Sequence, residues 1–179
     1  MIENLQRLIP TILKRVQEGL DRPDTWDSLA INRRKPHTNR IFQEIEGFRV
    51  CLHRFEACEE NEAFPHPHPW PGAFLLLEGE YIHTVGGSAD LKSRPEYFIR
   101  EIIRPYSIYE IINTKTWHKV QPLKETYTVT LNGVPWTEEE RHEEVRTTKG
   151  KGLQPLSDDE LVTHLVEFER MLHLYNARS

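Results

Sequence analysis

The chain has 179 residues, a length that fits one domain able to bury its own hydrophobic core. Acidic residues outnumber basic ones by 28 to 23, and the resulting net charge of −5 argues against nucleic-acid binding, which normally requires a basic excess. Apolar runs stay far below the roughly 18 residues of a membrane span, and the N-terminus lacks the apolar stretch of a signal peptide. With only Cys51 and Cys58, the chain fits a reducing compartment, so we expect a cytoplasmic protein.

The first segment is predicted to be helical. Apolar residues recur at helical spacing from Ile2 to Leu20, and Pro10 in the middle should kink this helix or divide it in two. We assign residues 1–27 to the helical region. Residues 28–39 are rich in Asn, Arg, Lys and Pro, and are predicted to form a connecting loop.

From Arg40 onward the pattern is typical of strands. Phe48, Val50 and Leu52 alternate with polar or small residues, as in a half-buried strand. Further predicted strands, separated by Gly, Pro or Asn-Gly turns, are 73–85, 97–103, 108–112, 117–120 and 127–131. No helical pattern lies between them, which argues against βαβ units. We expect an all-β core at 40–136, arranged as an antiparallel sandwich or barrel.

The C-terminal part is predicted to be a linker followed by a helix. Residues 137–156 are highly charged and include TTKGKG, which indicates an exposed linker. Ser157 and Glu160 form a capping box that opens a helix over 157–176. We treat 1–179 as a single domain. The apolar stripes of both terminal helices fit either the domain's own core or a second copy, so a homodimer is one expectation.

The stretch PHPHPWP carries the strongest chemical signal. In a strand, residues two positions apart point to the same face, so the imidazoles of His66 and His68 are placed to converge on one ion. The surrounding prolines hold the segment extended and remove ladder donors, as at an edge strand or the mouth of a barrel. Taken alone, the pair is equally compatible with a proline-rich surface segment or a polyproline II ligand.

A longer comparison favours the metal interpretation. PHPHPWPGAFLLLEGEYIHTVGG resembles the first motif of the cupin superfamily of RmlC-like barrels, with Gly79 at the expected offset of eleven residues from His68. RPYSIYEIINTKTWHKVQP resembles the second cupin motif and supplies His118. The resemblance covers about residues 40–136 and includes a subgroup with an H-x-H-P-W motif. It implies a cupin-like antiparallel β-barrel, or double-stranded β-helix, whose metal ligands are His66, His68 and His118.

The sequence departs from the common cupin pattern at Gly72. Many cupins carry a glutamate ligand four positions after the second histidine, whereas glycine cannot ligate. A set of three histidines remains, which suits Fe(II), the favoured ion, and also Zn(II), Ni(II) or Cu(II). Three-histidine cupins include the thiol dioxygenases. The cysteine that some of those enzymes carry after H-x-H has no counterpart near Ala73.

Other polar and aromatic residues are predicted to play lesser roles. His53 is interpreted as a hydrogen-bonded, half-buried residue, or as a second-sphere group or fourth ligand. His83 should face away from the pair because its parity along a regular strand is opposite. Glu78 and Glu80 should lie at the far end of that strand, solvated or in salt bridges. His142 is predicted to be solvated, and His164 and His173 to be surface or packing residues of the last helix. The aromatic residues expected to fill or line the core are Trp70, Tyr106, Tyr109 and Trp117.

Three functions are consistent with these residues. The first is a non-haem Fe(II) oxygenase, such as a cupin-type dioxygenase, that acts on a small molecule through His66, His68 and His118. The second is a non-catalytic barrel that binds a small ligand or a partner. The third is a Zn(II)-assisted isomerase or hydrolase. The motifs of zincin proteases, phosphate-binding loops and serine hydrolases do not occur.

Overall fold

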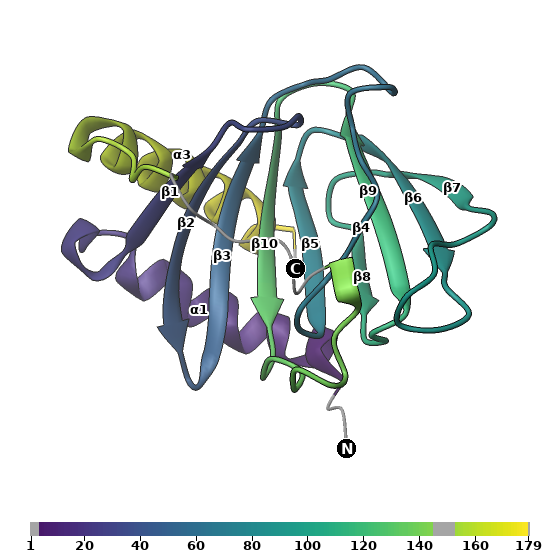
Figure 1. The fold of residues 1–179 in the computed structure, drawn as a ribbon. Coiled ribbons are helices and arrows are strands. Elements are labelled where there is room, and N and C mark those ends of the chain that lie inside the picture. The colour runs from purple at the N-terminus through teal and green to yellow at the C-terminus, as the bar shows by residue number, and fades with distance from the viewer. Residues whose placement is uncertain (1–3, 145–152, 179) are drawn as a thin grey trace.

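The structure, a computed structural model, describes residues 4–144 and 153–178. It consists of two antiparallel sheets with a helix near each end of the chain (Figure 1). Its strands are β1 (Asp27–Ile31), β2 (Thr38–Ile45), β3 (Phe48–Phe55), β4 (His66–Pro67), β5 (Gly72–Glu78), β6 (Tyr81–Gly87), β7 (Ile99–Ile103), β8 (Ile108–Ile111), β9 (Thr116–Pro122) and β10 (Thr126–Asn132). The predicted antiparallel β core flanked by two helices is therefore confirmed.

The sheets have the orders β1-β2-β3-β10-β5-β8 and β4-β9-β6-β7. Within the described residues no ladder joins the two sheets, so the predicted barrel is not closed. Segment 73–85, expected as one strand, is divided into β5 and β6 by a turn at Gly79. The φ of Gly79 is +96°, a region that residues with a side chain rarely adopt. An added Cβ at Gly79 would also lie 2.4 Å from Thr126 Oγ1.

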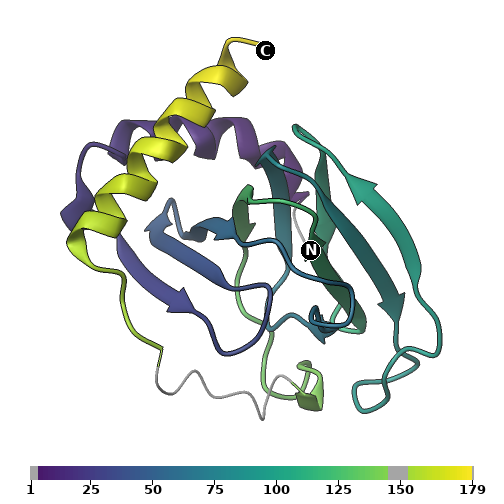
Figure 2. The ribbon, with the colours of Figure 1, turned by 90° about the horizontal axis from the view of Figure 1, so that it is seen from above.

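The helices cover one face of the six-stranded sheet (Figure 2). A short 3₁₀ segment η1 (Leu5–Leu8) leads into α1 (Ile9–Gly19), and Pro10 stands in the first turn of α1. Proline is tolerated there because the first N–H groups of a helix have no intrahelical acceptor. The helix α3 (Asp158–Asn176) begins at the predicted capping box, with Ser157 and Glu160 bonded reciprocally.

Strand register separates the two faces of the six-stranded sheet. In β10, the helix-facing residues Tyr127, Val129 and Leu131 belong to the main hydrophobic cluster, together with Leu52 and Phe168. The residues between them, Thr128, Thr130 and Asn132, face the second sheet and are also buried. A second, smaller cluster lies between the sheets and comprises Leu76, Tyr81, Ile103 and Val120 with Tyr109.

Two predicted irregular segments contain structure. β1 (Asp27–Ile31) occupies part of 28–39, where a loop was expected, because it pairs with β2 along its whole length. The described ends of the predicted linker also pack on the body. Gln154 bridges to Ala30, and Leu156 is 7% exposed. Residues 145–152, which include all of TTKGKG, lie outside the described residues.

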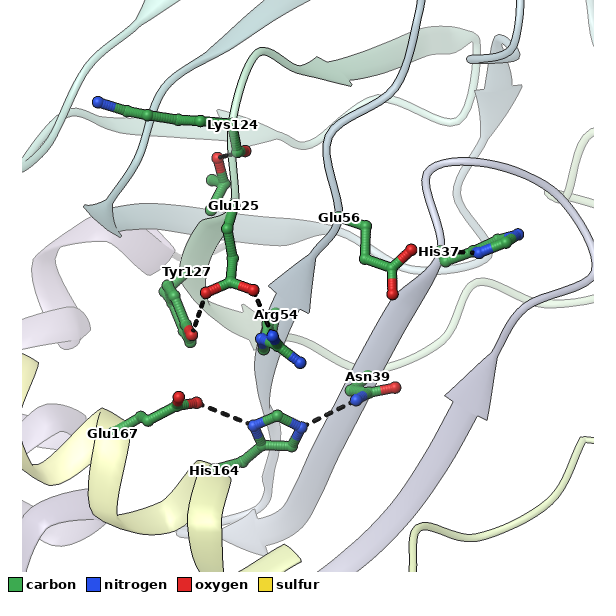
Figure 3. Close-up of polar contacts among 10 residues, drawn as sticks. His37, Asn39, Arg54, Glu56, Lys124, Glu125, Tyr127, His164 and Glu167 are labelled. Atoms are coloured by element: carbon green, nitrogen blue, oxygen red, sulfur yellow. Dashed lines mark hydrogen bonds and ion pairs between the residues drawn. The ribbon is translucent and has the colours of Figure 1, made fainter. Parts of the chain in front are cut away.

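Polar contacts also hold α3 against the sheet (Figure 3). His164 of α3 lies between Glu167, 2.9 Å from its Nδ1, and Asn39 of β2, 2.8 Å from its Nε2. Nearby, Glu125 accepts hydrogen bonds from Tyr127 and Arg54. No described helix is long and apolar enough to cross a membrane.

Candidate metal centre

The site lies where β4 pairs with β9. His66 stands directly opposite His118 in this antiparallel pair, so the two side chains share a face. β4 has only two residues and forms an edge of its sheet. Pro67 fits this position because an edge strand does not need every N–H as a donor. The proline-rich segment is thus an edge strand, as expected from its lack of donors.

The three predicted histidines form one cluster. The ring centroids of His66, His68 and His118 are 4.6 to 5.3 Å apart. One ring nitrogen of each lies within 4.8 Å of the others, and no other group of this kind occurs among the described residues. Nε2 of His68 is 2.7 Å from Nε2 of His118. His118 is buried, while His66 and His68 are partly exposed.

Hydrogen bonds define which nitrogens are available to an ion. Nδ1 of His66 is 3.3 Å from the carbonyl oxygen of Phe64, which can only accept, so Nδ1 carries the proton and Nε2 keeps its lone pair. Nδ1 of His118 is 3.0 Å from Nε2 of His83. Nδ1 of His83 is in turn 3.2 Å from the carboxylate of Glu101. In the neutral form this relay places protons on both Nδ1 atoms and leaves the lone pair on Nε2 of His118, the nitrogen that faces His68.

The position of His83 corrects the sequence prediction. It was expected to face away, on the assumption of one regular strand from the His66–His68 pair to Val85. The turn at Gly79 and the separate strands β5 and β6 break that regularity. In the sheet His83 stands opposite Val120 and so shares the face of His118, two residues away along β9.

Burial keeps the cluster neutral. Desolvation, with smaller contributions from the neighbouring histidines and, for His68, from Arg40, holds the pKa of His68 and of His118 well below its usual value. Burial also lowers the pKa of His66 and of His83; for His83, the carboxylate of Glu101 opposes the shift. Neutral imidazoles present the lone pairs that a metal ion requires, so the cluster is a competent donor set near neutral pH.

The residues fit a divalent transition metal. Three neutral imidazoles are a donor set that Fe(II), Ni(II) and Zn(II) accept. Nδ1 of His68 is buried without a hydrogen-bond partner, which leaves this ring bonded only through the nitrogen that faces His118. His83 and Glu101 supply the outer hydrogen bonds that typically orient a ligating histidine.

Aromatic side chains border the cluster. Phe74 lies 5.5 Å from the ring of His68 and stacks on Tyr109 at 4.9 Å. Tyr81 donates a hydrogen bond of 2.8 Å to the hydroxyl of Tyr109, whose own hydrogen remains available to another acceptor. Burial raises the pKa of both phenols, so both stay protonated at neutral pH. Tyr109 therefore faces the interior, as predicted for a lining residue.

His53 is not part of the cluster. Its Nε2 accepts a hydrogen bond of 2.8 Å from Nε of Arg40, and its Nδ1 is 3.3 Å from the hydroxyl of Thr130. Both nitrogens are thus engaged, so the fourth-ligand interpretation is wrong and the hydrogen-bonded one is confirmed. Burial and the charge of Arg40 hold the pKa of His53 well below its usual value.

The other predicted histidines do not belong to the cluster. His142 was expected to be solvated but is 1% exposed, because its ring packs on Trp117 at 4.8 Å and its Nε2 bonds the carbonyl of Ser93. His164 is a packing residue on α3, and His173 is exposed.

The predicted acidic and aromatic candidates also divide by position. Glu78 forms a salt bridge with Arg170 of α3, and Glu80 lies in the turn before β6. Trp117 is fully buried, next along β9 to His118 and so on the opposite face. Tyr106 packs near Tyr175, and Trp70 lies over Arg49. Only Tyr109 of the four predicted aromatics contacts a residue of the relay directly, at 4.3 Å from the ring of His83.

Two residues of the site environment were not predicted from the sequence. Glu101 reaches His83 because β7 pairs with β6, which places the two residues directly opposite. Arg40 reaches His53 through the pairing of β2 with β3. Both contacts depend on strand register, and the only sequence signal was the location of each residue in or beside a predicted strand.

No family model matches this sequence, and no curated protein matches it. Solved structures do. The structure of hydroxypropylphosphonic acid epoxidase from S. wedmorenis matches with a TM-score of 0.48 and 11% identity, over 62% of this chain and 56% of that one. Fe(II)-HppE with the alternative substrate (S)-1-HPP matches with a TM-score of 0.48 and 11% identity, over 62% and 57%. Co(II) HppE in complex with substrate gives 0.43 and 10%, over 57% and 55%. The matches span little more than half of those chains.

Proposed function

We propose that this protein is a non-haem Fe(II) oxygenase that acts on a small molecule, with the ion held by His66, His68 and His118. The observation that carries the proposal is the convergence of three neutral imidazoles, with no carboxylate in the cluster, between two sheets. A three-nitrogen set leaves a divalent ion with open positions and its full charge. When bound, Fe(II) would supply those open positions for substrate and for O2 activation.

The protein's own residues would prepare and protect this site. Glu101 and His83 fix the tautomer of His118, and Phe64 fixes that of His66. Phe74 and Tyr109 exclude water from one side of the cluster, while the partial exposure of His66 and His68 leaves the other side accessible. The free hydrogen of the Tyr109 hydroxyl is a donor for a bound polar group.

Metal binding is tested first, on untagged protein freed of metal by a chelator. We expect one Fe(II) or Co(II) per chain in an anaerobic titration, and a loss of at least about tenfold in affinity for His66→Gln and His118→Gln. His173→Gln, on the exposed surface of α3, is the matched control. Equal affinity of all three variants and the wild type would disprove the proposed ligands.

The reaction class is tested on the Fe(II)-loaded protein. Nitric oxide, an O2 surrogate, should bind the iron and give the EPR signal of an iron–nitrosyl complex, because an oxygenase needs an open position. A silent EPR spectrum, with iron bound, would reject the oxygenase and favour a closed structural site. Anaerobic turnover that persists with Zn(II) would instead support the isomerase or hydrolase, and ligand binding that survives chelation would support a non-catalytic barrel.

A further inference from the structure

The face of the six-stranded sheet that looks toward the histidines carries an unusual positive group. Arg40 of β2 stands directly opposite His53 of β3, and His53 stands opposite Thr128 of β10. Thr128 and Thr130 are on the face that looks away from the helices. Because directly opposed residues share a face, Arg40 belongs to this interior row. Its neighbour Asn39, on the other face, contacts α3.

Arg40 has no anionic partner. Its Nε donates to the neutral ring of His53, and within residues 4–144 and 153–178 no carboxylate lies within salt-bridge distance of it. Its two Nη atoms make no hydrogen bond with the described residues. The side chain is only partly exposed, and burial lowers its pKa, yet a guanidinium stays protonated at neutral pH.

A second guanidinium lies on the same face. Arg49 stands opposite Asn132, with its Cζ 4.0 Å from the ring centroid of Phe42 and 5.9 Å from that of Trp70. Its Nε is buried without a hydrogen-bond partner. Charges removed from water in this way are unfavourable unless they are paired. Glu44 of β2 stands directly opposite Arg49, whereas Arg40 stands opposite a neutral histidine, so Arg40 is the cation for which the protein does not supply an anion itself.

A chain of contacts connects Arg40 to the histidine cluster. His53 bonds both Arg40 and Thr130, Thr130 stands opposite Phe74, and Phe74 packs on His68. A metal ion among neutral histidines would add further positive charge and strengthen the preference for an anion.

We propose that the substrate is a small organic anion, whose carboxylate group binds the Nη atoms of Arg40 while another part of the molecule reaches the metal. A guanidinium presents its donors in a planar fork that matches such a group with two parallel hydrogen bonds. The bond from Nε to His53 orients this fork. The inference rests on the proposed metal site and specifies the substrate class for it.

The test uses Co(II)-loaded protein and calorimetric titration with linear monocarboxylates of two to six carbons. The corresponding primary amides have nearly the same shape without the charge. We compare the wild type with Arg40→Gln, Arg40→Lys and the control Arg15→Gln, which removes an exposed charge on α1. Circular dichroism and Co(II) affinity show whether each variant is folded.

For both the wild type and Arg15→Gln, at least one carboxylate should bind more than about tenfold tighter than the corresponding amide. Arg40→Gln should lose about 10- to 100-fold of that carboxylate affinity at unchanged Co(II) affinity, and Arg40→Lys should lose less. The substrate class is overturned if Arg40→Gln binds the carboxylate as tightly as the wild type does, if the amides bind as tightly as the carboxylates, or if no carboxylate binds. The proposed metal site is unaffected by any of these results. If Co(II) does not bind, the proposed function fails instead, and the same titration on metal-free protein decides whether Arg40 binds anions.

Discussion

Acid should destabilise the metal-free protein steeply below about pH 6.5, because the fold holds His53, His68 and His118, among other histidines, in their neutral form. Burial holds the pKa of His53, His68 and His118 well below the value of 6.5 for an exposed histidine. In the unfolded chain the same residues take up protons as the pH falls through 6.5. The unfolded state then binds more protons than the folded state, so the free energy of unfolding decreases toward acid pH.

The size of the effect follows from proton linkage. A histidine that protonates only in the unfolded state lowers the free energy of unfolding by about 2 kcal/mol between pH 7.5 and pH 5. Three such residues together lower it by about 6 kcal/mol, an upper value that applies while none of them titrates in the folded protein. Small domains are stable by only about 5–15 kcal/mol, so this loss approaches the whole stability.

Urea unfolding at pH 7.5, 6.5, 5.5 and 5, in the presence of a chelator, measures this dependence. His53→Gln should reduce the change in unfolding free energy over the range by about 2 kcal/mol, the contribution of one such histidine. His173→Gln, an exposed residue, should leave it unaltered. A free energy of unfolding that is constant from pH 7.5 to pH 5 would refute the reasoning, as would an unchanged pH dependence in His53→Gln.

Three further predictions address the outer hydrogen bonds, the turn and the thiols. Glu101→Gln and His83→Gln should each weaken Co(II) binding by about 10- to 100-fold, because His118 loses its fixed tautomer; affinities equal to that of the wild type, measured by titration, would exclude this role. Gly79→Ala should destabilise the fold by about 2–4 kcal/mol through its positive φ and the overlap with Thr126, seen as a lower urea midpoint. Gly87→Ala, with no atom within 4 Å of the added Cβ, is its control. A thiol reagent should modify Cys58 under native conditions and Cys51 only after unfolding, because Cys51 is 1% exposed; rapid reaction of both thiols in the folded protein would contradict this.

Local patterns were sufficient to predict most of the elements. The alternation around Val50 identified β3, and the capping box at Ser157 identified the start of α3. β1 was missed because its residues alternate little in burial and are held mainly by pairing with β2. That pairing joins two segments separated by a loop, so it cannot be predicted from the residue pattern of either segment alone.

In the candidate site, too, local spacing predicted some residues, and contacts between strands determine the others. The grouping of His66 with His68 follows from spacing, whereas His118 was reached only through a family resemblance. His83 was misplaced because parity counts are valid only within one unbroken strand, and the turn at Gly79 restarts the count. Glu101 and Arg40 reach their histidine partners across strands, so only the sheet register brings them in.

The alternation of side chains along β10 affects which substitutions the protein can accept. Its odd-numbered residues Tyr127, Val129 and Leu131 maintain the core under the helices, and its even-numbered residues face the interior that we assign to the substrate. Substitutions at Thr128, Thr130 or Asn132 can therefore alter ligand preference without removing apolar packing from the main core. Under the proposed function, residues that face the ligand and residues that build the main core therefore alternate along one strand, so a substitution made for specificity leaves the side chains of the main core in place.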